Sequence, residues 1–154
     1  RSKAGRVVGQ SKDVWENYID WRIMRMVESA EELGTDQLSE VIKRGSNTGL
    51  RVFRSLKLQD SAPPGGERCG LLKWQHEESV CIGDPGRAQW CYDYANDLVR
   101  QHKLAIVREV LEDYRADGIE LDFMFNKYYF RQSDIERNIP MEYSHNECVR
   151  SPGS

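Results

Sequence analysis

The stretch DGIELDF at residues 117–123 governs how the rest of this chain is interpreted. Its alternation places three apolar side chains on one face of a predicted strand, and Glu120 and Asp122 on the other. Carboxylates withdrawn from water are costly unless they are paired, hydrogen-bonded or used in chemistry. Asp122 also falls at the carboxyl end of the strand, where open sheets and β/α barrels place their active sites. The sequence therefore predicts a functional site at this strand end.

The composition is typical of one soluble globular domain. The chain has 154 residues, a length that allows one ordinary domain with a usable core. Of these residues 39% are hydrophobic and 31% are charged. A net charge of −3 disfavours nucleic acid and anionic membranes as partners, because phosphate contact needs concentrated Lys and Arg. The sequence has neither an apolar run of the roughly 20 residues that span a membrane nor a signal-peptide core. These features favour the cytoplasm but leave the compartment open, and Arg1 in place of Met predicts an N-terminus that is cut, processed or incomplete.

The cysteines have neither C-x-x-C spacing nor the paired spacing of a zinc site. They are Cys69, Cys81, Cys91 and Cys148. Reduced thiols of a cytosolic protein are expected, and a disulfide between two of the three cysteines at 69–91 is the alternative for an exported protein. No metal ion and no cofactor are expected.

Two helices are predicted in the N-terminal part of the chain. A short helix should begin at Asp36 and end at Gly45. The helix before it should end near Gly34 and carries an aromatic and methionine stripe at helical spacing, which predicts core packing. The stripe comprises Trp15, Tyr18, Ile19, Ile23, Met26, Val27 and Ala30.

A βαβ unit is predicted in the second half of the chain. It consists of a strand at 50–58, a helix at 97–114 and a strand at 118–124, and such a crossover makes the strands parallel. The long connection after the first strand, at about residues 59–96, is rich in aromatic residues and is called the aromatic connection. It leaves the sheet at the end where Asp122 lies. Its aromatic residues, together with Asp60, are therefore expected to gather near Asp122.

Several segments resemble a known family, the glycoside-hydrolase-like TIM barrels of bacteria. In that family a pattern of the type W..DYA...VR.....I.REV...Y..DGIELDF surrounds the fourth barrel strand. The similarity covers roughly residues 15–137 and includes the expected third strand. The segments that carry it are 36–42, 49–60, 73–77, 90–95, 98–100, 106–109 and 114–123.

The chain departs from the family pattern at the expected sugar-binding positions. The third strand of the family tends to end in Arg, Asn, Asp and then His, whereas here Lys57, Gln59, Asp60 and Ala62 take these places. Phe125 stands where the family usually carries an Arg. Lys for Arg is not neutral where binding needs the planar, bidentate fork of a guanidinium group.

The resemblance implies a partial (β/α)8 TIM barrel, because a complete barrel takes about 250 residues. We expect the barrel-like domain to occupy residues 1–137 and an irregular or disordered tail to occupy residues 138–154. The chain is therefore interpreted as a fragment or truncated relative of an enzyme acting on glycosidic bonds of a poly- or oligosaccharide. As an isolated chain it is expected to be inactive, and its exposed sheet edges should favour self-association.

Glycoside hydrolysis generally needs two carboxyl groups, one acid and one base or nucleophile. Asp122 is the expected nucleophile or base, and Glu120 lies one inward position lower, where it would orient Asp122. The second acid would normally come from a later strand. The expected carbohydrate-binding residues are Lys57, Gln59, Asp60, Trp74, His76, Trp90, Asp93 and Tyr94.

Some of these residues have plainer alternatives. Asp93 could pair with Arg100 and anchor the loop to the helix, His76 could be a surface histidine, and Asp117 could serve only the turn before Gly118. Two other functions also compete with glycoside hydrolysis. One is a metal-dependent barrel enzyme with Asp60, Glu120 and Asp122 around Mg²⁺. The other is a non-catalytic carbohydrate-binding or structural fragment.

Overall fold

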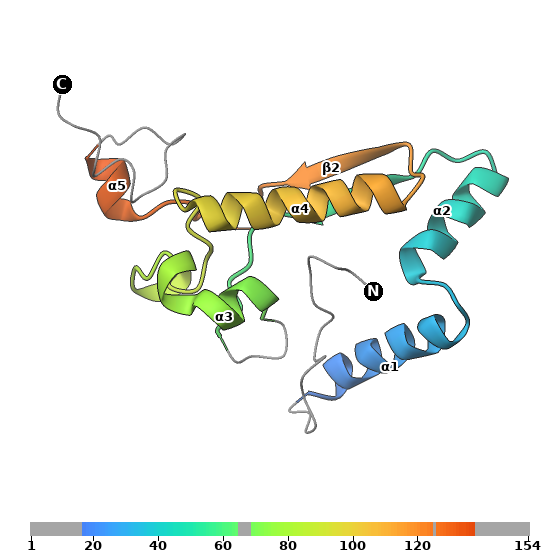
Figure 1. The fold of residues 1–154 in the computed structure, drawn as a ribbon, viewed down its shortest axis with the longest axis horizontal. Helices are drawn as coiled ribbons and strands as arrows, with labels where there is room; N and C mark the ends of the chain where they lie inside the picture. The colour runs from blue at the N-terminus through green and yellow to red at the C-terminus, as the bar shows by residue number, and fades with distance from the viewer. Residues whose placement is uncertain (1–16, 65–68, 125, 138–154) are drawn as a thin grey trace.

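The computed structural model describes residues 17–64, 69–124 and 126–137. Five α-helices, one short 3-10 helix and two strands make up this part of the chain (Figure 1). In order they are α1 (Tyr18–Glu32), α2 (Gln37–Asn47), β1 (Phe53–Lys57), α3 (Leu71–Val80), η1 (Gly86–Ala88), α4 (Asp97–Asp113), β2 (Gly118–Asp122) and α5 (Gln132–Glu136).

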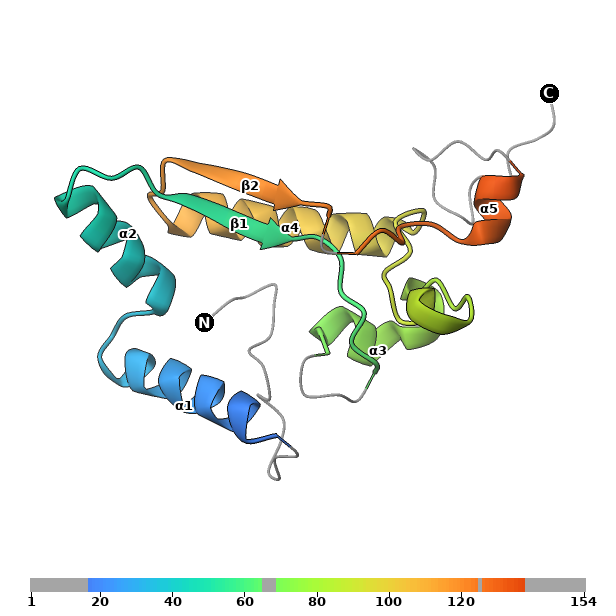
Figure 2. The ribbon, with the colours of Figure 1, turned by 180° about the vertical axis from the view of Figure 1, so that it is seen from behind.

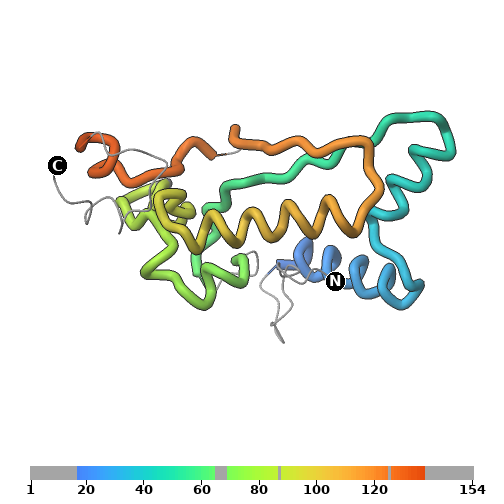
Figure 3. The backbone as a smooth tube through the Cα atoms, turned by 45° about the horizontal axis from the view of Figure 1, so that its top comes forward, coloured from blue at the N-terminus to red at the C-terminus, as the bar shows by residue number. Residues whose placement is uncertain are grey.

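The two strands are parallel, as the βαβ pattern predicts, and α4 is the crossover helix between them. They pair from Phe53 with Gly118 to Lys57 with Asp122, and they form the whole sheet within the described residues. Figure 3 follows the chain from α2, at the end where the strands begin, to α3 and α5, at the end where they finish. The observed class is therefore mixed α/β, with a small parallel sheet.

One face of the sheet is covered by α4 and the other is open. Arg54 and Leu58 point to the covered face and are buried, whereas Ser55 and Lys57 are exposed. Figure 2 shows the sheet from the side opposite α4, where no described helix lies over the strands. We call this side the open face; it carries Ser55, Lys57, Glu120 and Asp122.

Helix α2 continues past Gly45 to Asn47, so the prediction that Gly45 ends it was wrong. Gly45 is buried, and a Cβ on it would lie 2.3 Å from Cγ2 of Val52. The glycine is therefore required by close packing against the segment that leads into β1, rather than by a turn. The turn itself uses Gly49, which has a φ of +73°.

The stripe on α1 does not form a core, which corrects the prediction from its spacing. Most of its described members are exposed, including Tyr18, Ile19 and Met26, while Met24 is buried beside the stripe. Trp15 lies outside the described residues. Helical spacing defines a face but not what covers it, and Figure 1 shows α1 lying away from the sheet.

The main core forms instead around the aromatic connection that follows β1. Val80, Cys81, Tyr92 and Val99 make one buried cluster, and Ile82, Ala88 and Cys91 make another. The sequence shows little periodicity in this connection, yet it contains α3 and η1 and closes through an antiparallel bridge between Cys81 and Tyr92. The connection is thus a packed subdomain at the end of the strands.

Cys69, Cys81 and Cys91 are buried, and no disulfide joins them to one another. The alternative of a disulfide within 69–91 is therefore wrong for this structure, and Cys148 lies outside the described residues. Burial raises the pKa of Cys81 to about 11 and also raises the pKa of Cys91. Burial also raises the pKa of the Tyr92 and Tyr94 hydroxyls.

These shifts predict a loss of stability in alkaline solution. In the folded chain the pKa of the Cys81 thiol lies above its ordinary value of 9.0. The stabilisation that the buried, protonated thiol gives to the folded state is therefore complete below pH 9 and is lost as the pH rises toward 11. We expect Cys81 alone to lower the free energy of unfolding by roughly 2 kcal/mol across this window. Urea unfolding at several pH values measures the slope, and Cys81→Ala should flatten it. An equal slope in that variant would contradict the assignment.

Candidate functional site

The candidate site is centred on the carboxyl end of the sheet, where Lys57 and Asp122 are paired in register on the open face. Asp122 is half-buried, and its Oδ1 accepts a hydrogen bond of 2.8 Å from the backbone N–H of Met124. This contact holds the carboxylate at the turn where the chain leaves β2. Glu120 lies two residues earlier, is exposed, and is paired in register with Ser55.

Gln59 follows β1 and joins three segments of the chain. It is 2% exposed, and its Nε2 donates to the carbonyl oxygens of Tyr92 and Tyr128 at 2.9 and 2.5 Å. Its Oε1 accepts from the N–H of Tyr92 at 2.7 Å and from the N–H of Asp60 at 3.0 Å. Both ends of the amide are therefore used inside the fold, and we assign Gln59 to the framework of the site rather than to a ligand.

Asp60 is directed inward rather than toward the open face. Its Oδ2 lies 3.2 Å from Nζ of Lys73, and its Oδ1 accepts from the N–H of Ala62 at 2.7 Å. These contacts fix the first turn of the aromatic connection. Asp60 therefore has a structural role at the start of this connection.

Asp93 pairs with Arg131 and not with Arg100, so the alternative pairing expected from the sequence was wrong. Its Oδ2 accepts from Nε of Arg131 at 3.1 Å, and its Oδ1 accepts from the N–H of Ala95 at 3.0 Å. Arg100 instead bonds to Asp97 and to the carbonyl oxygens of the loop before α4. The Asp93–Arg131 pair thus joins the loop before α4 to the segment after β2.

The four predicted aromatic and histidine residues divide into two groups. Tyr94 donates from its hydroxyl to the carbonyl oxygen of Leu58 at 2.5 Å, and Trp90 is half-buried beside the loop that follows β2. Trp74 and His76 lie on α3 and are exposed. The structure thus brings Tyr94 and Trp90 to the strand ends, whereas Trp74 and His76 point to solvent elsewhere.

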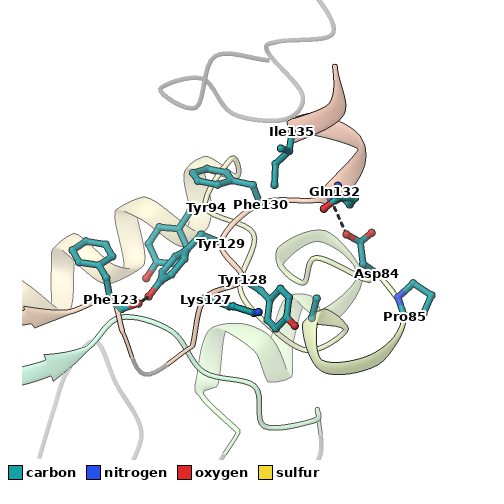
Figure 4. A pocket seen from close by; sticks show the side chains of 11 residues that line it. Asp84, Pro85, Tyr94, Phe123, Lys127, Tyr128, Tyr129, Phe130, Gln132 and Ile135 are labelled. Carbon is teal, nitrogen blue, oxygen red and sulfur yellow. Dashed lines mark hydrogen bonds between the residues drawn. The ribbon is translucent and has the colours of Figure 1, made fainter. Parts of the chain in front are cut away.

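An aromatic cavity of about 620 Å³ opens beside the end of β2. Tyr129 lines it, with its ring centroid 5.2 Å from that of Tyr94 and 5.7 Å from that of Phe123. Figure 4 shows these rings together with the polar pair at the rim, where Asp84 accepts a 2.8 Å hydrogen bond from the N–H of Gln132. The other lining residues are Pro85, Ala88, Lys127, Tyr128, Phe130 and Ile135.

A second cavity, of about 690 Å³, shares Lys127 and Tyr128 with the first. It is also lined by Trp90 and Asn126, with Ser61, Gly86 and Met124 completing the wall. Two hollows therefore flank the segment 127–128 immediately after the acidic strand.

The sequence prediction missed the residues after β2 that line these cavities. Tyr128, Tyr129 and Phe130 are three consecutive aromatic residues only a few positions after Asp122, and this run is the signal that could have identified them. Burial, with a smaller contribution from the charge of Asp122, raises the pKa of the Tyr129 hydroxyl. That hydroxyl donates to the carbonyl oxygen of Phe123 at 2.6 Å. Tyr129 is therefore linked both to Asp122 and to the aromatic cavity.

No protein-family model and no curated protein matches this chain.

The described residues contain no group of three His, Cys, Asp or Glu side chains arranged to hold a metal ion. Asp60 faces Lys73, whereas Glu120 and Asp122 lie on the open face, so these three carboxylates do not form a common centre. Across the ranges that the structure covers, every helix is too short or too polar to span a bilayer.

Proposed function

We propose that this chain is part of a glycoside-hydrolase-like β/α barrel protein that acts on glycosidic bonds of a poly- or oligosaccharide. The observation that carries the proposal is the pairing of Lys57 with Asp122 at the carboxyl end of a parallel sheet whose second face is open. An open face lined by Ser55, Lys57, Glu120 and Asp122 resembles the polar interior that a barrel presents at its catalytic end.

In this proposal Asp122 acts as nucleophile or base toward the anomeric carbon or its attacking water. Glu120, at about 7 Å along the strand, would position Asp122 rather than contact the sugar. Lys57 would bind a hydroxyl or stabilise the charge of Asp122. The two-stranded sheet provides one wall of a cleft, so the second acid would come from another strand and the chain alone should not cleave sugars.

Carbohydrate binding without cleavage is the second candidate function, and the aromatic cavities favour it. Sugar rings stack on aromatic faces through their apolar C–H groups, and the walls of the two cavities offer Trp90, Tyr94 and Tyr129. Of these, Tyr129 lies near enough to Asp122 to feel its charge. Hydroxyl groups would find Lys127, Asn126 or Asp84 at the rims. The same site would serve as a substrate subsite in the complete enzyme.

The test is a fluorescence titration of the full chain with oligosaccharides of different linkage. We expect at least one series to change the tryptophan emission, because Trp90 lines the second cavity. Trp90→Phe should remove the change, and the matched variant Trp74→Phe, on the exposed side of α3, should keep it. Asp122→Asn should leave the affinity within about twofold if the carboxylate serves chemistry rather than ground-state binding.

Release of reducing sugar is measured in the same samples and is expected to be absent. A response that disappears only in Trp74→Phe would contradict the placement of the sugar site. Measurable cleavage by this chain would overturn the proposal that another strand must supply the second acid. A rise in melting temperature with Mg²⁺ and none with sugars would favour the metal-dependent alternative.

A further inference from the structure

The aromatic cavity beside the end of β2 has walls made mainly of aromatic rings. The rings of Tyr94 and Tyr129 meet at an interplanar angle of 64°, and those of Phe123 and Tyr129 meet at 52°. Figure 4 shows Phe130 lining the cavity together with these rings. The walls therefore present both the faces and the edges of aromatic rings to a ligand.

The hydroxyl protons of Tyr94 and Tyr129 are already used inside the fold. Tyr94 donates to the carbonyl oxygen of Leu58 at 2.5 Å, and Tyr129 donates to that of Phe123 at 2.6 Å. A sugar ring placed between these walls would turn several hydroxyl groups toward aromatic carbon. Because each buried hydroxyl without a partner costs roughly 1–3 kcal/mol, the walls favour a ligand that has few such groups.

Two charged residues of opposite sign, Asp84 and Lys127, belong to the lining. Oδ2 of Asp84 accepts a hydrogen bond of 2.8 Å from the N–H of Gln132, and Nζ of Lys127 lies 5.6 Å from the ring centroid of Tyr128. A negatively charged ligand would be repelled by Asp84, and a positively charged one by Lys127. The lining therefore favours an uncharged compound.

The walls of the cavity are held together before any ligand binds. The N–H of Tyr94 donates to the carbonyl oxygen of Tyr129 at 2.8 Å, which joins the loop before α4 to the segment after β2. Two apolar residues of the lining, Phe123 and Ile135, are nevertheless 50% and 48% exposed. A ligand that covers them removes apolar surface from water without first having to order the walls.

We propose that the aromatic cavity binds an uncharged, planar aromatic compound of one or two fused rings. Its ring packs against Tyr129 and Phe130 and extends the edge-to-face arrangement that the wall already has. A volume of about 620 Å³ lies within the range of small-molecule sites. The proposal does not rest on action at glycosidic bonds, and it leaves carbohydrate binding to the second cavity, which Trp90 lines.

The test is equilibrium dialysis of the full chain against 2-naphthol, whose own fluorescence reports its free and bound concentrations. Decahydro-2-naphthol is the matched competitor, because it has the same fused skeleton and hydroxyl group but is neither planar nor aromatic. We expect 2-naphthol to bind one site per chain and decahydro-2-naphthol to compete about fivefold more weakly, since contacts between aromatic rings add to the effect of burial alone.

Three variants locate the binding site. Phe130→Leu removes one ring of the wall but keeps an apolar side chain, and it should weaken 2-naphthol binding about fivefold. The matched variant Phe53→Leu, at an exposed ring where β1 begins, should keep the affinity. Tyr129→Phe keeps the ring and loses only the hydroxyl, so its affinity should stay within about twofold of the parent chain. Circular dichroism checks that each variant is folded.

The comparison of the two naphthols on the parent chain decides the proposal even where a variant does not fold. Equal binding of the two compounds would overturn it, as would unchanged binding by a folded Phe130→Leu variant. Displacement of 2-naphthol by glucose at the same concentration would also overturn it, because the cavity would then accept a sugar. The oligosaccharide titration that follows Trp90 is read separately. A chain that binds 2-naphthol but no oligosaccharide would keep this inference and lose the proposed function.

Discussion

Gln59→Ala is expected to lower the free energy of unfolding by about 3 kcal/mol, the largest loss predicted for a single uncharged side chain here. The truncation removes the two N–H groups that bond to the carbonyl oxygens of Tyr92 and Tyr128. It also leaves the buried N–H of Tyr92 without its acceptor. A buried polar group that loses its partner costs roughly 1–3 kcal/mol, and part of this cost would be recovered by water entering the space.

Urea unfolding followed by circular dichroism measures the effect, with an unchanged slope showing that the transition stays comparable. Gln101→Ala on the exposed side of α4 is the matched control and should stay within about 0.5 kcal/mol of the parent chain. If Gln59→Ala were equally neutral but removed a response to oligosaccharides, Gln59 would be a ligand residue after all.

The sheet and its crossover helix could be predicted because their signals are local. Alternation at 119–123 and the apolar period of 97–114 each specify one element, and the βαβ rule then fixes the parallel pairing. The structure has β1 at Phe53–Lys57, α4 at Asp97–Asp113 and β2 at Gly118–Asp122. Because side chains alternate along a strand, the shared face of Glu120 and Asp122 also followed from the sequence.

The roles of the residues around the site could not be predicted in the same way. Gln59 bonds to Tyr128, 69 positions away, and Asp93 bonds to Arg131, 38 positions away. Such contacts leave no periodic trace in the sequence, so a polar residue after a strand looks the same whether it binds a ligand or the backbone. The apolar stripe on α1 shows the opposite case. Its helical spacing predicted the helix correctly, but it did not predict whether another element packs against that face.

In the proposed function, sugar binding and framework roles fall to different residues of similar type. Gln59, Asp60 and Asp93 hold the loops together, whereas Lys57, Glu120 and Asp122 remain on the open face. In the proposed site the first group sets where the cavities form and the second supplies the chemistry. Substitutions in the first group should change stability before they change sugar affinity.

Asp93→Ala is expected to lower the free energy of unfolding by about 3 kcal/mol, comparable to the loss from Gln59→Ala. The carboxylate is 1% exposed, and its removal leaves the N–H of Ala95 without an acceptor and Arg131 without its partner. Because the Arg131 side chain is 29% exposed, solvent limits the second part of the cost. Asp93→Asn should lose only about half as much, since an amide oxygen can still accept from Ala95.

The comparison of Arg131→Met with Arg100→Met tests which arginine Asp93 uses. In a double-mutant cycle, Asp93→Ala should couple to Arg131→Met by about 1–2 kcal/mol and to Arg100→Met by less than about 0.5 kcal/mol. Asp113→Ala, an exposed aspartate at the end of α4, provides the control for removing one negative charge. Coupling to Arg100 instead of Arg131 would show that the loop before α4 is anchored within itself. The Asp93–Arg131 ion pair would then not be what holds the segment after β2, with its aromatic run, to the loop before α4.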